Sequence, residues 1–272
     1  MPELPDDTAI RRTADGRPFI IPPGGGKPIP YTRSSTFARA LDDAAGLMAW
    51  KQQMLLKGIM ENPGLIPQGL SPMDYRTAQP VIETLMDAAG ANDAANYGTA
   101  CHNLAWLMDF TDEHLASVYN LETDRLEWLD RYVELTKGME MIEGEVFAVN
   151  DAYQCAGTMD RLVRLPDGRV VTADIKTGNT LHLQQFAIQV AVYATSQRYD
   201  PLTAERRPLH PDLDVTVGLV IHVPQEKKGV VGPASVIGLD LVAGLELASL
   251  SLAVRKSRTA KVVADIKERI QA

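Results

Sequence analysis

The sequence predicts an α+β protein in which a helical N-terminal region precedes a small mixed sheet. Three observations support this fold class. Apolar residues recur at helical spacing over much of residues 33–140. The alternation typical of a half-buried strand begins at 142–150 ("IEGEVFAVN"), and a hairpin pattern follows at 157–178. A helical pattern at 181–199 then leads to two more strand-like segments, which favours a crossover helix packed on a mixed sheet.

The chain is expected to have an arm and one domain. Residues 1–32 include the Pro- and Gly-rich stretch "RPFIIPPGGGKPIP" and predict an extended N-terminal arm. Residues 33–272 are expected to form a single domain, with a helical part at about 33–140 and a sheet-containing core at about 141–272. The expected helices cover 33–59, 73–110, 123–139, 181–199 and 243–257, and the later strands cover 214–224 and 234–241.

The composition is that of a soluble globular protein. Of the 272 residues, 45% are hydrophobic and 23% are charged. No apolar run approaches the roughly 18 residues of a membrane span, and the first residues lack the apolar core of a signal peptide. The two cysteines, Cys101 and Cys155, are too few for a disulfide framework or a metal knuckle. We therefore expect a cytoplasmic protein without a membrane partner.

The net charge of −8 argues mildly against a nucleic-acid partner, because Lys and Arg carry phosphate binding. The distribution of charge matters more than its sum. Residues 255–261 ("RKSRTAK") contain Arg255, Lys256, Arg258 and Lys261 and no acid. This segment is either a solvated helix end or a basic patch that contacts phosphate.

The hairpin at 157–178 carries an unfavourable pair of charges. Its turn, Pro166-Asp167-Gly168, combines a fixed φ, a side chain that caps its own backbone and a residue suited to positive φ. If these three residues form the loop, Asp160 lies directly opposite Asp174. Like charges at opposed cross-strand positions are destabilising. A two-residue Asp167-Gly168 loop would shift the register by one and move Asp160 to the other face.

A bound divalent cation explains this pairing. Strand alternation places Asp174 and Lys176 on the face opposite the apolar set of Val171, Ala173 and Ile175. Two carboxylates suit Mg²⁺ or Mn²⁺, and a neighbouring lysine can act on an attacking water. The alternative is an exposed hairpin whose acids are solvated and offset by Lys176.

Three further features have both a functional and an ordinary interpretation. His102 follows Gly98 by one helical turn and is either a metal ligand or a packed or surface histidine. Glu143 and Glu145 lie on one face of the strand before the hairpin. They are either acids of the site or the ordinary solvent-exposed face of that strand. Gln189 and Tyr193 are four residues apart among apolar neighbours, and buried side chains of these types need partners.

Together these features resemble a known family. The ordered motifs are G-x-x-x-H (Gly98 to His102), a strand Glu, G-x-x-D (Gly157 to Asp160), D-x-K-T-G (Asp174 to Gly178) and Q-x-x-x-Y (Gln189 to Tyr193). This combination resembles the RecB-nuclease-like branch of the PD-(D/E)XK superfamily, particularly its compact bacteriophage exonucleases. The resemblance spans about residues 98–193. It implies a restriction-endonuclease-like core and a metal-dependent deoxyribonuclease of phage or bacterial DNA recombination, repair or replication.

The resemblance also implies roles for individual residues. His102, Asp160, Asp174 and the Ile175 carbonyl would bind Mg²⁺ or Mn²⁺, Glu145 is preferred over Glu143 as the strand acid, Lys176 would be the catalytic lysine, and Gln189, Tyr193 and Thr177 would support the site and the DNA backbone. Two cysteines cannot supply the four ligands of the iron–sulfur cluster found in some relatives. A Walker A loop is also missing from the sequence, so no nucleotide is expected.

The expected partner is a single- or double-stranded DNA end, with a recombinase or single-strand-binding protein as a further possible partner. Arg33, Lys51 and the 255–261 cluster are the expected phosphate contacts. Two other functions remain open at this point. One is a non-catalytic nucleic-acid-binding or assembly subunit, and the other is a metal-dependent hydrolase of small phosphoesters.

Overall fold

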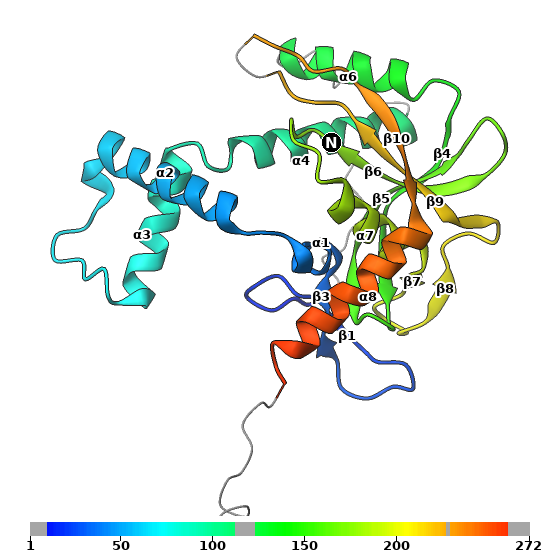
Figure 1. The fold of residues 1–272 in the computed structure, drawn as a ribbon, viewed down its shortest axis with the longest axis horizontal. Helices are drawn as coiled ribbons and strands as arrows, with labels where there is room; N and C mark the ends of the chain where they lie inside the picture. Colours follow the sequence, from blue (N-terminus) through cyan, green and yellow to red (C-terminus); the bar gives the residue numbers. More distant parts are fainter. Residues whose placement is uncertain (1–9, 112–122, 227–228, 261–272) are drawn as a thin grey trace, which may run out of the picture. The chain divides into compact units, whose positions relative to one another are not determined.

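The computed structural model describes residues 10–111, 123–226 and 229–260. It divides the chain into two compact units, a helical unit at 42–105 and a sheet unit made of 1–41 and 106–272. Both units are drawn in Figure 1. Helix α4 (Asp93–Phe110) contributes residues to each unit. None of the described helices combines the length and the apolar character of a membrane-spanning segment.

The sheet unit is built on a mixed sheet, as the sequence predicts. Its strands are in the order β10-β9-β6-β5-β4-β7-β8, and β3 pairs with β5 from outside this path. Most neighbours are antiparallel, whereas β6 with β9 and β3 with β5 are parallel. The strands are β3 (Thr32–Arg33), β4 (Glu140–Asn150), β5 (Cys155–Arg164), β6 (Val170–Lys176), β7 (Gln197–Tyr199), β8 (Arg206–Pro208), β9 (Leu213–His222) and β10 (Ser235–Asp240).

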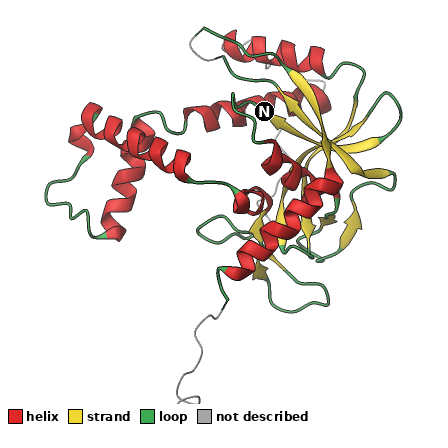
Figure 2. Ribbon diagram, in the orientation of Figure 1, coloured by secondary structure: helices red, strands yellow, loops and turns green. Residues whose placement is uncertain are grey.

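Helices flank this sheet (Figure 2). α7 (Leu183–Ala194) and α8 (Leu241–Ser257) pack on each other and on β9, and their apolar side chains form a core with Val220 and Leu239. α6 (Thr123–Leu135) is joined to the chain that follows β9, because the Trp128 indole N–H donates to the Val223 carbonyl at 2.8 Å. α1 (Ser34–Ala38) and the short η1 (Arg39–Leu41) lie near α7 and α8.

The described part of the expected N-terminal arm packs on the sheet unit. β1 (Phe19–Ile20) and β2 (Ile29–Pro30) pair with each other. Ile20 is 0% exposed and Tyr31 is 2% exposed, and both join a core cluster with Val149 and Tyr199. These residues are extended, as expected, but they are part of the core.

The helical unit contains α2 (Ala45–Glu61), η2 (Pro63–Leu65), α3 (Tyr75–Ala88) and most of α4. α2 and α3 cross closely at Gly58, where an added Cβ would come within 2.2 Å of the Leu85 carbonyl oxygen. The Lys57 ammonium donates to the Ala89 carbonyl at 2.8 Å and joins the ends of the two helices.

Three expected helices differ from the observed ones. The helix expected at 33–59 is interrupted after η1, and the Asp43 carboxylate accepts from the Ala45 N–H at the start of α2. The helix expected at 73–110 divides at Gly90, whose φ of 86° ends α3. The helix expected at 181–199 ends at Ala194, because the residues after it form β7 and pair with β4.

The contact between α7 and α8 predicts the effect of substituting Gly244. A Cβ at this position would come within 2.6 Å of the Ala187 carbonyl oxygen and 2.9 Å of the Ala191 Cβ. Gly244→Ala should therefore lower the free energy of unfolding by about 1–3 kcal/mol, although alanine is usually the better helix residue. Urea denaturation followed by circular dichroism measures the change. Gly238→Ala in β10 is the control, since nothing lies within 4 Å of its added Cβ. Equal effects of the two substitutions would contradict this packing.

Candidate metal and nuclease site

The turn of the central hairpin sets the register of the site. The Leu165 N–H donates to the Arg169 carbonyl at 2.8 Å, and the Gly168 N–H donates to the Leu165 carbonyl at 2.9 Å. Gly168 has a φ of 89°, which glycine tolerates. The loop is therefore Pro166-Asp167-Gly168, and the predicted register is confirmed.

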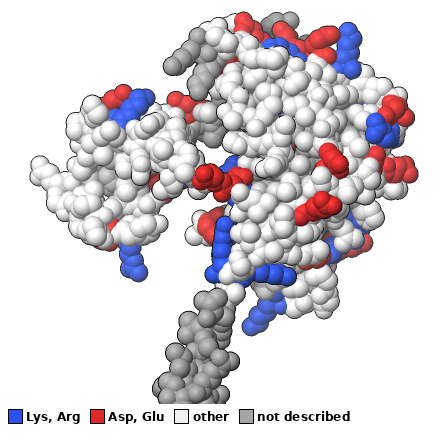
Figure 3. Space-filling model, in the orientation of Figure 1, with Lys and Arg blue, Asp and Glu red and all other residues white. Residues whose placement is uncertain are grey.

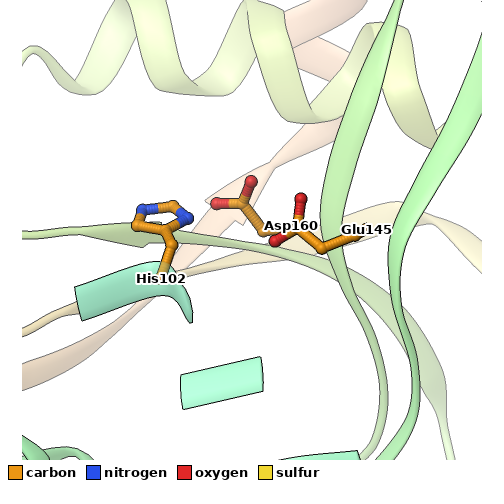
Figure 4. A group of neighbouring side chains, drawn as sticks. All are labelled: His102, Glu145 and Asp160. Carbon is orange, nitrogen blue, oxygen red and sulfur yellow. The ribbon is translucent and has the colours of Figure 1, made fainter. Parts of the chain in front are cut away.

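Three acids from three adjacent strands lie in one row across the sheet. The β5–β6 pairs run to Arg161 opposite Ala173, and one further step in this register brings Asp160 opposite Asp174. Between β4 and β5, the pairs on either side place Glu145 opposite Asp160. One oxygen of Glu145 and one of Asp160 lie within 4.8 Å of each other (Figure 4). We call Glu145, Asp160 and Asp174 the acid row.

Glu145 has an unusual backbone and an unusual carboxyl group. Its φ is 54°, a left-handed conformation that is rare for a side chain of this kind and is associated with functional positions. Burial and the negative charges of Asp160 and Asp174 raise its pKa to about 7, although Arg161 opposes the shift. The Glu145 carboxyl is therefore poorly stabilised as an anion.

Glu143, the other acid considered on this strand, has a different partner. Arg198 on β7 forms a bidentate pair with its carboxylate, with Nη2 to Oε2 at 2.6 Å. The structure thus brings Glu145 to Asp160 and holds Glu143 at Arg198.

A buried arginine supports the acid row from β5. Arg161 is 0% exposed, and its Nε donates to the Asp109 carboxylate at 2.7 Å. The Tyr132 hydroxyl donates to the same carboxylate at 2.7 Å, and Arg161 Nη1 lies 3.4 Å from Glu145 Oε1. Sequence reasoning did not identify this network, because Asp109, Tyr132 and Arg161 are far apart in the chain and belong to no motif.

Asp174 is buried and bonded within the protein. It is 3% exposed, Gln189 donates to its Oδ1 at 2.9 Å, and the Lys176 ammonium lies 2.5 Å from its Oδ2. Burial alone would lower the pKa of Lys176, but the Asp174 and Asp160 carboxylates outweigh burial and raise it. Gln189 therefore has the buried partner that its sequence context requires.

The alternative of a solvent-exposed hairpin does not fit β6. Val170 to Ile175 are all buried, including Thr172 at 1% exposed, because β6 lies between β5 and β9 and is covered on both faces. Only Lys176 at the end of the strand is partly exposed. The Ile175 N–H donates to Asp160 Oδ2 at 2.8 Å, whereas the role of its carbonyl as a metal ligand stays a prediction.

Gln189, Tyr193 and Arg33 line one pocket of about 460 Å³, together with Arg12, Ser34 and several neighbours. The first motif glycine has a steric role here, since a Cβ on Gly157 would come within 2.7 Å of the Tyr193 hydroxyl. We call this pocket, lined by Arg12, Gly16, Arg33, Ser34, Ser35, Gly157, Thr158, Gln189 and Tyr193, the arginine pocket.

Arg255 donates to the Thr32 hydroxyl at 2.8 Å and Arg258 to the Ala40 carbonyl at 3.2 Å, so both guanidinium groups bind their own chain. The Thr177 carbonyl accepts from the Gln225 N–H at 2.9 Å. Lys51 on α2 and His102 on α4 belong to the helical unit, and His102 is labelled in Figure 4. Lys256 is in the last turn of α8, and Lys261 lies outside the described residues.

No protein-family model matches this sequence, and no curated protein shows a significant match to it. The argument for a function therefore rests on the residues and their geometry.

The raised pKa of Glu145 predicts a pH-dependent stability of the metal-free protein. Between pH 4.5 and about 7, the unfolded chain releases a proton that folded Glu145 retains, so the free energy of unfolding falls as the pH rises through this window. The loss is at most about 3 kcal/mol. Glu145→Gln should remove this component, as measured by urea denaturation at pH 5 and pH 8 in EDTA. The control is Glu134→Gln on α6, which removes an acid that is 78% exposed. If parent and Glu145→Gln show the same pH dependence, the raised pKa is wrong.

Proposed function

We propose that this protein is a metal-dependent DNA exonuclease with a restriction-endonuclease-like core of the PD-(D/E)XK type. The observation that carries the proposal is the acid row, with the Lys176 ammonium held on Asp174 at its end. Paired carboxylates can hold the divalent cation that assists phosphodiester hydrolysis, and a neighbouring lysine can act on the attacking water.

The charges of the site favour a cation. Among the described residues, Arg161 pairs with Asp109 and Glu145, and Lys176 pairs with Asp174, beside the Asp160 carboxylate. Carboxylate oxygens are the ligands that Mg²⁺ and Mn²⁺ prefer, and such an ion would offset the repulsion that raises the pKa of Glu145.

Each part of the site has a role in this mechanism. Glu145, Asp160 and Asp174 would hold the ion, which when bound would stabilise the charge that develops on the phosphate and the leaving oxygen. Gln189 fixes the orientation of Asp174 through its hydrogen bond. Lys176 would orient the attacking water or stabilise the charge of the transition state.

Basic side chains for DNA phosphates are also present, despite the acidic total. Arg12 and Arg33 line the arginine pocket beside Gln189, which is bonded to Asp174. On the face in Figure 3, basic side chains also gather at the end of α8, whose last turn carries Arg255 and Lys256. We propose that the arginine pocket contacts the DNA backbone next to the acid row.

Digestion of labelled DNA tests the function directly. Linear and circular DNA, single- and double-stranded, are incubated with the protein in Mg²⁺, in Mn²⁺ and in EDTA. The proposal requires loss of label from linear DNA in either metal, with circular DNA intact and no reaction in EDTA. DNA binding without cleavage in both metals would instead support the non-catalytic subunit. Hydrolysis of small phosphoesters alone would support the third function.

Lys176→Ala separates catalysis from binding. An ammonium ion cannot ligate a cation, so this substitution should leave DNA affinity in Ca²⁺ within about threefold of the parent and should slow cleavage in Mg²⁺ by roughly a hundredfold or more. Asp174→Asn should lose metal dependence and cleavage together. The control is Lys137→Ala, which removes a lysine that is 78% exposed. Cleavage by Lys176→Ala at the parent rate would overturn the proposed mechanism.

His102 is proposed as a nitrogen ligand that adds to the acid row, as the family resemblance implies. His102→Ala should raise the Mn²⁺ concentration needed for half-maximal cleavage by roughly tenfold, because one ligand is lost while the acids remain. The control is His210→Ala, in the loop between β8 and β9. An unchanged Mn²⁺ requirement would show that His102 is not a ligand.

A further inference from the structure

A second pocket adjoins the acid row and has a different character from the arginine pocket. Its volume is about 400 Å³, within the range of about 300–1,000 Å³ for small-ligand sites. Four aromatic side chains, Trp106, Phe110, Phe147 and Tyr199, line it, and Glu145 of the acid row is part of its wall. We call it the aromatic pocket.

The rings of the aromatic pocket form two tilted pairs. Trp106 and Phe110, on the last turns of α4, have centroids 6.1 Å apart at 47°. Phe147 on β4 and Tyr199 on β7 are 6.4 Å apart at 59°. Within each pair the rings are tilted, not stacked face to face. The Arg161 guanidinium lies 5.4 Å from the Phe110 centroid, which fixes that ring beside the acid row.

The charges of this pocket select a neutral ligand. Glu143, Glu145 and Arg198 line it, so two carboxylates face one guanidinium that is already in a bidentate pair. An anionic phosphate placed among these groups would be repelled. A neutral heteroaromatic ring would instead stack on the aromatic side chains and form hydrogen bonds with the polar side chains of the pocket, Glu143, Glu145 and Arg198.

We propose that the aromatic pocket binds an unpaired nucleobase of the DNA end, next to the phosphodiester held at the acid row. This inference rests on the proposed nuclease function, and it names the substrate as an end with at least one unpaired base. Glu145 joins the two sites, so a base in the pocket has its own phosphate near the acid row. A base within a duplex is stacked and paired, and it can enter only after unpairing.

The test compares oligonucleotides with and without the terminal base. Single-stranded DNA carries either a normal nucleotide or an abasic nucleotide at the 5′ end or the 3′ end, and its affinity is measured by fluorescence anisotropy in Ca²⁺. The parent protein should bind the normal end roughly tenfold more tightly than the abasic end at one of the two termini, because stacking on an aromatic side chain is lost.

Substitutions locate the effect in the pocket. Trp106→Leu keeps an apolar side chain but removes the ring, so the affinity ratio between normal and abasic ends should fall to about one. Trp106→Phe should retain most of the ratio. The matched control is Tyr75→Leu in the helical unit, which removes a ring that is 74% exposed and does not line the pocket.

Each outcome distinguishes the two proposals. If the parent cuts linear DNA but shows no preference for a normal base at either end, the aromatic pocket is not a base site and the nuclease function stands. If Trp106→Leu keeps the preference for the normal end, the terminal base does not bind in the aromatic pocket. If the parent neither binds nor cuts DNA, the proposed function itself fails.

Discussion

The register of the three strands β4, β5 and β6 is the constraint on which the candidate site depends. The Pro166-Asp167-Gly168 loop fixes β5 against β6, and the β4–β5 pairs on either side of Glu145 place it opposite Asp160. A slip of one residue at either pairing would send Asp160 to the other face and separate the acid row. This register holds like charges at directly opposed positions, which is destabilising.

The protein offsets this repulsion only in part. Lys176 pairs with Asp174, Arg161 lies near Glu145, and the Ile175 N–H donates to Asp160. Arg161 also forms an ion pair with Asp109, so its positive charge is divided between two carboxylates. Burial and the neighbouring charges of Asp160 and Asp174 still raise the pKa of Glu145.

Rigid elements hold this site in place. Gln189 and Tyr193 lie one turn apart on α7, which is buried along most of its length between the sheet and α8. Gln189 reaches Asp174, and the Tyr193 hydroxyl approaches β5 at Gly157, where only a hydrogen leaves room for it. Two pockets adjoin the acid row through different residues, one through Gln189 and one through Glu145. One lining includes Arg12 and Arg33, and the other includes four aromatic side chains.

The sequence by itself determined the local features. Turn chemistry and alternation predicted the loop, the register and hence the opposition of Asp160 and Asp174, because these follow from neighbours in the chain. Helical spacing found α6, α7 and α8, although it extended α7 into β7, whose pairing with β4 is a long-range contact. The Pro- and Gly-rich composition predicted an extended N-terminal arm. The described residues of that arm pack into the core through Ile20 and Tyr31.

Only the tertiary structure decided what surrounds the acids. Burial of Asp174 depends on β9 and α7, which cover β6, and no pattern within β6 reveals them. Glu145 lies near Asp160, whereas Glu143 pairs with Arg198 from the distant strand β7. Arg161, Asp109 and Tyr132 come from three distant segments, and their pairing depends on charges that meet only in the folded chain. Sequence patterns record periodicity along one element, whereas charge and burial at a site depend on every element packed around it.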